Sequence, residues 1–348
     1  MLKKIDTDYL KGVGILLIML HNVFHLMNNA PGENEYSFSF EYTYHFAYNI
    51  LHTPGDILKQ FFSFFGHYGV QIFIFLSAYG LTVKYGNQSI NYASFIKKRI
   101  AKLYPVFLGA VVLFLLITFR KILMGKMVLD VVPFIKSLAL KLTFTSNLIP
   151  GEALSLCGPW WFFSLIVQLY LLYPILIKLK NKHLLFIVFA VWLIQLIIII
   201  FTPGSIDYLR INSIGHLPEF ITGIYLARIK IHRIKFYHFV IALLIFISGC
   251  INKFCWVFSF FSVPVMAIYL YRFVEHDGKS YLQKFIIFMG RNSLYLFAVH
   301  GFLRPPFIAL GNKSIPLSAV SAVAFVLFSI LAAIFLKYLV TKIIKPNK

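Results

Sequence analysis

Two histidines, His21 and His25, lie in the interior of the first apolar segment of the chain. A bilayer core about 30 Å thick makes a buried ionisable group costly, so such residues are functional candidates. Lys11 precedes His21 by ten residues, a rise of roughly 15 Å on an α-helix. If Lys11 marks one membrane face, His21 lies near the midplane. A base at this depth predicts chemistry across a membrane.

Such a base suits general acid–base chemistry, in which a neutral imidazole takes the proton of a hydroxyl group as the hydroxyl oxygen attacks a substrate. Burial disfavours the charged imidazole, so we expect His21 to stay neutral and basic. His25 lies one turn further on the same face and is the second candidate for the base. The alternative is that both histidines only hydrogen-bond to neighbouring helices.

The composition is that of a membrane protein. The 348 residues are 59% hydrophobic and 13% charged, and the mean hydropathy is +0.80, whereas about a quarter of a soluble domain is charged. We predict an all-α fold, a polytopic helical bundle of about ten transmembrane helices. It forms a single domain over 1–348 with no fused soluble domain. The spans are expected at 9–28, 60–83, 104–123, 160–178, 183–202, 212–229, 236–252, 254–273, 285–303 and 315–338.

The basic residues are distributed unequally between the two predicted faces. Of the 33 Lys and Arg, 23 fall on the face that holds both termini and 10 on the other. The positive-inside rule therefore predicts a multi-pass protein of the cell (cytoplasmic) membrane with both termini in the cytoplasm. This explains the net charge of +21 without a nucleic-acid partner. The first segment is expected to be a retained signal anchor, and the amphipathic stretch 120–141 to lie along the interface.

Several segments follow one another in a specific order along nearly the whole chain. They are DYLKGVGILLIMLH at 8–21, GVQIFIFLSAYGL at 69–81, FIKKRIAKLYP at 95–105, GPWWFFSLIVQLYLLYP at 158–174, LPEFITGIYLAR at 217–228 and GRNSLYLFAVHGFL at 290–303. In content and order they resemble the membrane-bound acyltransferases that O-acylate surface glycans, acyltransferase family 3. The resemblance implies transfer of an acyl group, usually acetyl, from cytoplasmic acyl-CoA to a carbohydrate hydroxyl. Acetyl-CoA is then a donor substrate, and no permanently bound cofactor and no metal are expected.

The resemblance also implies a donor site made of Lys11, Arg99, Lys102 and Arg291. Arg99 and Lys102 lie three residues apart on one helical face, where they could clamp the phosphates of coenzyme A. The alternative is that this basic run only sets the topology. Arg291, at the cytoplasmic mouth of the ninth span, could add to the donor site or anchor its helix.

A second set of residues is expected around the acceptor, on the outer side. This set is Trp160, Trp161, Gln168, Glu219 and His300. A tryptophan pair at that depth is also typical of an aromatic belt. Glu219 could orient a histidine or a sugar hydroxyl, and His300 could line the acceptor channel or hydrogen-bond to a neighbouring helix.

The chain departs from the family pattern at three places. Nine residues, not ten, separate Lys11 from His21, a shift of about 100° on a helix, so the base could be His25. Lys102 replaces the second arginine of the Arg-x-x-Arg pair. Ile166 and Val167 stand in a segment where many members are acidic.

Four questions stay open at this level. Cys250 and Cys255 flank a predicted hairpin, where a disulfide or free thiols would both fit, and the three cysteines have no metal spacing.

The alternative function is a glycan or lipid carrier or flippase whose histidines gate or relay protons. A transporter often shows paired broken helices, which we do not find here. A polysaccharide, a lipid-linked sugar, peptidoglycan or a small metabolite would each fit as acceptor, and the sequence assigns no oligomeric state.

Overall fold

The computed structural model describes residues 2–35, 38–86, 88–229, 234–274 and 280–344. Within these ranges all regular structure is helical and there is no strand, which confirms the all-α prediction. The first helices are α1 (Lys4–Phe24), α2 (Phe40–His52), α3 (Ile57–Phe65), α4 (Gly69–Tyr85), α5 (Tyr92–Leu123), α6 (Val131–Leu142), α7 (Trp161–Leu176) and α8 (Asn181–Phe201). They are followed by α9 (Ile206–Arg210), α10 (Ser213–Arg228), α11 (Phe236–Ile251), α12 (Lys253–Trp256), α13 (Ser259–Tyr271), α14 (Tyr281–Arg291), α15 (Ser293–Leu303), α16 (Pro305–Gly311) and α17 (Ile315–Ile344).

A helix lies at each place where a span is predicted, but not every helix is long and apolar enough to cross a bilayer. Among the described residues five segments are, namely Pro54–Tyr85, Tyr92–Leu123, Gly158–Leu176, Asn181–Phe201 and Ile315–Lys342, and the bent pair α14–α15 adds a sixth if the pair forms one span. Helices α10 and α11 have 16 residues and α13 has 13, a rise of about 24 Å or less against a core of about 30 Å. The prediction of about ten spans is therefore not confirmed.

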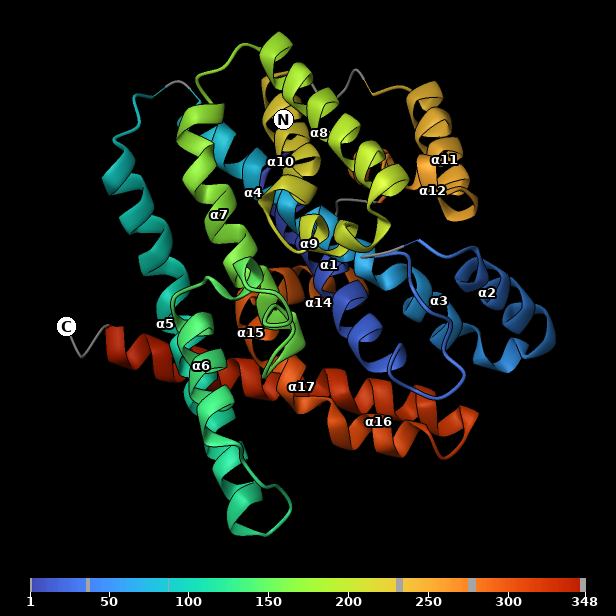
Figure 1. Ribbon diagram of the computed structural model, residues 1–348, viewed down its shortest axis with the longest axis vertical. Coiled ribbons are helices and arrows are strands. Elements are labelled where there is room, and N and C mark those ends of the chain that lie inside the picture. The colour runs from blue at the N-terminus through green and yellow to red at the C-terminus, as the bar shows by residue number, and fades with distance from the viewer. Residues whose placement is uncertain (1, 36–37, 87, 230–233, 275–279, 345–348) are drawn as a thin grey trace.

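Helix α1 lies at the centre of the molecule and packs against α3, α4, α14, α15 and α17 (Figure 1). Glycines allow this close approach. A Cβ on Gly66, in the turn between α3 and α4, would lie 2.6 Å from the Cβ of His21. A Cβ on Gly290 of α14 would overlap the backbone oxygen of Asp8. The elements around α1 are therefore held in a fixed register by backbone contact.

Helices α14 and α15 meet at Asn292 with a bend of 82°, where a single straight span over 285–303 is predicted. The Asn292 side chain donates a hydrogen bond of 2.8 Å to the backbone oxygen of Phe288, in the last turn of α14. It also accepts one of 3.0 Å from Lys337 Nζ of α17. Arg291 is the last residue of α14 and therefore lies at the bend, beside α1.

The outer surfaces of the long helices carry large apolar side chains. Phe186, Phe189 and Leu193 of α8 are exposed, as are Leu116 and Phe119 of α5. Exposed apolar surface on this scale is unusual for a soluble protein and is expected where helices face lipid. Helix α6, which lies beside the lower part of α5 in Figure 1, falls in the stretch predicted to lie along the membrane interface.

Candidate active site

A cavity of about 820 Å³ opens among α1, α4, α5, α7, α14 and α15. Six basic side chains line it, against one acidic side chain, Asp8. They are Lys4, Lys11, Lys84, Arg99, Lys102 and Arg291. A concentration of positive charge in a hollow attracts multiply charged anions such as phosphates. The cavity therefore has the electrostatics of a phosphate-binding site.

The same cavity has an apolar part. Phe73 of α4, Val106 of α5, Phe162 of α7 and Phe297 of α15 are among its lining residues. Phe162 stands at the centre of this aromatic group, with its ring centroid 6.4 Å from that of Phe73 and 4.9 Å from that of Phe297. A ligand with a charged head and an uncharged tail would fit both parts.

Arg99 is held in place by aromatic rings. Helix α5 begins after Asn91, whose side chain accepts a hydrogen bond of 2.9 Å from the Ser94 amide. About two turns after Asn91, the guanidinium of Arg99 lies over the rings of Phe95 and Tyr85, at 5.5 and 5.9 Å from their centroids. Arg99 Nη2 also donates a hydrogen bond of 3.4 Å to the Tyr85 hydroxyl. Stacking fixes the plane of the guanidinium and leaves its edge able to bind an anion.

The opposite wall of the cavity combines α1 with the bend between α14 and α15. Arg291 Nε lies 3.3 Å from Asp8 Oδ2 in an ion pair. The arginine side chain is 62% exposed, so this pair is weak and its guanidinium can still reach a ligand. Lys11 lies one turn after Asp8 on α1.

All four residues predicted for the donor site, Lys11, Arg99, Lys102 and Arg291, line this one cavity. Sequence reasoning missed Lys4 and Lys84. Lys84 directly follows the predicted span 60–83 and stands in the last turn of α4, a position that topology alone explains. Only the packing of α4 against its neighbours places it on the cavity.

His21 and His25 lie further along α1, outside the cavity lining. The cavity reaches Phe73, whose ring lies 3.1 Å from a Cβ built on Gly14. His21 follows Gly14 by seven residues, about 10 Å along the helix. The apolar part of the cavity therefore leads towards the histidines but ends before them.

His21 is 4% exposed, and its ring is oriented by backbone oxygens. Its Nδ1 lies 2.9 Å from the oxygen of Ser63 and 3.3 Å from that of Phe62. When Nδ1 carries the proton and donates it here, Nε2 has a free lone pair. The His25 ring stacks on His21 with centroids 4.4 Å apart, and its Nδ1 lies 2.8 Å from the backbone oxygen of His21. Both histidines therefore keep Nε2 for other partners.

The loop after α1 brings Glu33 to the histidine pair. One ring nitrogen of His21, one of His25 and a carboxylate oxygen of Glu33 all lie within 4.8 Å of one another. Such a set could bind a cation or a hydroxyl group. Sequence reasoning missed Glu33, because it follows His25 by eight residues in a loop whose path no periodicity predicts.

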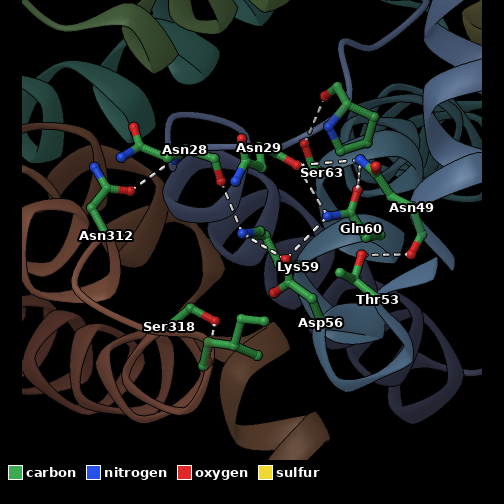
Figure 2. Close-up of polar contacts among 12 residues, drawn as sticks. Asn28, Asn29, Asn49, Thr53, Asp56, Lys59, Gln60, Ser63, Asn312 and Ser318 are labelled. Atoms are coloured by element: carbon green, nitrogen blue, oxygen red, sulfur yellow. Dashed lines mark hydrogen bonds and ion pairs between the residues drawn. The ribbon is translucent and has the colours of Figure 1, made fainter.

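A network of buried polar groups fixes this loop, as Figure 2 shows. Lys59 Nζ donates to the backbone oxygen of Asn28 at 2.9 Å and forms an ion pair of 2.6 Å with Asp56. Gln60 Nε2 donates to the oxygen of Asn29 at 3.1 Å. Ser63 Oγ donates to the oxygen of Pro31 at 3.0 Å. The same α3 thus orients His21 through the Ser63 oxygen and holds the loop that leads to Glu33.

The residues expected on the acceptor side lie elsewhere in the protein core, outside the cavity lining. Trp160 Nε1 donates to the backbone oxygen of Ala298 at 2.9 Å, and its side chain is 0% exposed. Trp161 stacks on His216 at 5.7 Å between centroids. Both tryptophans are buried, so they do not form an aromatic belt.

Glu219, Gln168 and His300 are buried as well or hold helices together. Glu219 Oε1 lies 3.0 Å from His216 Nδ1, so its predicted pairing with a histidine is present. Gln168 Nε2 donates to Asn147 and its Oε1 accepts from the Ser213 amide, each at 2.9 Å. His300 Nδ1 lies 3.1 Å from the backbone oxygen of Leu296. These contacts fit helix packing, and an acceptor role for the set stays a prediction.

The three cysteines have free thiols, so no disulfide joins Cys250 and Cys255. Cys157 is buried, while the other two are half-buried.

Comparison with protein families gives one match. The model of acyltransferase family 3, described as an acyltransferase domain, matches residues 5–341. No curated protein and no solved structure matches the chain. The match begins in α1 and ends in α17, so it includes the histidine pair and every residue of the cavity lining except Lys4.

Proposed function

Because the chain belongs to acyltransferase family 3 and is therefore an acyltransferase, we propose that acyl-CoA, in the first place acetyl-CoA, is its donor. The acyl group passes to a hydroxyl of a cell-envelope glycan or a lipid-linked sugar. His21 acts as the general base of the reaction.

The observation that carries this proposal is the cavity itself. Coenzyme A combines several phosphates with a long uncharged arm that ends in the thioester. The cavity combines six basic side chains with an apolar interior directed along α1 towards His21. Phosphates would bind beside Arg99, Lys102 and Arg291, and the arm would extend past Phe73.

The transfer itself needs one base and no permanently bound group. His21 Nε2 takes the hydroxyl proton while the oxygen attacks the thioester carbonyl carbon. The tetrahedral intermediate collapses, the carbon–sulfur bond breaks and the thiolate leaves. The imidazolium then returns the proton to sulfur, so that an ester and free coenzyme A are the products. The contact of His21 Nδ1 with the Ser63 oxygen holds the ring in the tautomer that this step requires.

The arrangement of charge supports a cytoplasmic donor side. Lys4, Lys11, Lys84, Arg99 and Lys102 all line the cavity at the N-terminal end of α1. A cluster of this sign belongs on the cytoplasmic face, which is where acyl-CoA is available. The cell membrane, with both termini in the cytoplasm, is the location that fits this orientation.

The proposal is tested with membrane vesicles from cells that make the protein, supplied with labelled acetyl-CoA. We expect label in the glycan or lipid-sugar fraction, and release of the coenzyme A thiol in an amount equal to the label transferred. His21→Ala should lower the rate by about 10²- to 10⁴-fold, as expected for loss of a general base, while acetyl-CoA binding is retained. His25→Ala should reduce the rate less.

Two results would contradict the proposal in different ways. Normal turnover in His21→Ala with an inactive His25→Ala would move the base to His25. Normal turnover in both variants, or no thiol release in the unmodified protein, would refute the mechanism.

A further inference from the structure

Glu33 lies within 4.8 Å of a ring nitrogen of both His21 and His25. Three atoms that satisfy this limit can all lie about 2.8 Å from one point between them, which is a hydrogen-bond distance. One hydroxyl oxygen at that point would be in reach of all three groups. Because each Nδ1 is already engaged with a backbone oxygen, the nitrogens available to it are the two Nε2 atoms.

The position of Glu33 is set by rigid neighbours. Lys59, Gln60 and Ser63 of α3 fix the backbone oxygens of Asn28, Asn29 and Pro31, as Figure 2 shows for this part of the loop. Three of the five residues before Glu33 are therefore tied to α3. Asn34, directly after Glu33, is buried, and its backbone oxygen accepts a hydrogen bond of 2.5 Å from Trp256 Nε1. The loop is thus anchored on both sides of the carboxylate.

Burial, and not a neighbouring charge, sets the pKa of the Glu33 carboxyl. His21 and His25 face it from α1, Glu35 from the same loop, and Arg210 of α9 acts on Glu35. Burial raises the pKa of the Glu33 carboxyl to about 7. Burial, together with the charge of Glu33, raises the pKa of Glu35 to about 8, although Arg210 opposes this. Glu33 is therefore the first of the two carboxyls to ionise, and it does so near neutral pH.

We propose that Glu33 completes the acceptor-hydroxyl site as the counter-ion of the histidine base, an inference that rests on the proposed function. The acceptor oxygen lies between Glu33 and the two histidines. When the hydroxyl proton moves to His21, a positive charge forms in a buried place. The ionised carboxylate of Glu33 offsets this charge until the proton passes on to the leaving thiolate.

Removal of the counter-ion should slow the chemical step without weakening the binding of acetyl-CoA. An opposite charge within about 4–6 Å favours the protonated base by about 1–3 pKa units, each unit a factor of ten. In the vesicle assay Glu33→Gln should therefore lower kcat at least about tenfold, with the KM for acetyl-CoA unchanged. Glu33→Asp, which keeps the charge, should recover part of the loss. Glu41→Gln, an exposed glutamate on α2, is the matched control and should behave as the unmodified protein.

The pH profile distinguishes a counter-ion from a merely structural residue. Since Glu33 must be ionised to act, kcat should rise as the pH is raised through about 7. This rise in the pH–rate profile should be absent in Glu33→Gln. A fall in kcat without a change in this rise would overturn the proposal, as would an unchanged kcat. Stoichiometric zinc in the purified protein that disappears in Glu33→Gln would also overturn it, in favour of a metal site. If His21→Ala is inactive while Glu33→Gln is normal, only this inference fails and the proposed function stands.

Discussion

Arg99 and Lys102 present their charges to the cavity from successive turns of α5. Arg99→Ala or Lys102→Ala should weaken acetyl-CoA binding about ten- to a hundredfold, because each removes one charge-assisted contact worth about 1.5–3 kcal/mol. Equilibrium binding of labelled acetyl-CoA to the purified protein measures this. Lys98→Ala is the control, since Lys98 is exposed in the same turn and lies outside the cavity lining. Equal affinity in all three variants would mean that this basic run serves topology alone.

The residues expected at a donor site lie together, whereas those expected around the acceptor do not line the same cavity. Basic residues flank many of the predicted spans, but the resemblance to the family singled out Arg99 and Lys102, and both line the cavity. Glu33 could not be found in this way, because it reaches the histidines only through the contacts of its loop with α3. Trp160 was equally ambiguous, since an aromatic residue at a helix start fits a belt, a substrate site or a buried core. The sequence does not show that its indole faces α15.

At the scale of elements, the backbone contact between α1 and α14 shapes one wall of the cavity. A Cβ on Gly290 would overlap the backbone oxygen of Asp8, and a Cβ on Gly12 would overlap that of Ile286. Gly290→Ala should therefore separate the two helices and cost about 1–3 kcal/mol, as overpacking generally does. The midpoint of thermal unfolding in detergent should fall. Acetyl-CoA binding should weaken too, because Asp8 and Arg291 are displaced.

The control for this prediction is Gly80→Ala on α4. A Cβ there has no neighbour within 4 Å, so the unfolding midpoint should stay the same or rise, since alanine favours a helix over glycine by about 1 kcal/mol. An unchanged midpoint in Gly290→Ala would show that α14 can move away from α1 without loss of stability.

The positions of the helices were predictable from the sequence, but whether each helix is long enough to cross the membrane was not. Apolar periodicity marks α11 and α13 correctly, yet Asn252 caps a new helix between them and the two stay short. The single span predicted over 285–303 breaks at Asn292, where Lys337 of α17 binds the asparagine side chain. That contact joins residues 45 positions apart. Local patterns therefore located the elements, while tertiary contacts determined their ends and bends.

At the scale of the whole molecule, the basic cavity and the Glu33 site must face opposite sides of the membrane if the acyl group is transferred across it as proposed. The cavity lies at the start of α1 and the histidines near its end, so the orientation of this one helix decides the orientation of the reaction. Thr53 is exposed beyond the end of α2 on the histidine side, and Lys97 is exposed on α5 near the cavity. These two positions can report the orientation in intact cells.

In a background in which the three native cysteines are replaced by alanine, Thr53→Cys should react with a membrane-impermeant maleimide added to intact cells. Lys97→Cys should react only after the cells are permeabilised, because the positive-inside rule places the basic face in the cytoplasm. Labelling of both positions after permeabilisation is the control for accessibility. The reverse pattern would place the basic cavity outside, away from cytoplasmic acyl-CoA. Transfer from a cytoplasmic donor would then be impossible in this geometry, even if every side chain acted as proposed.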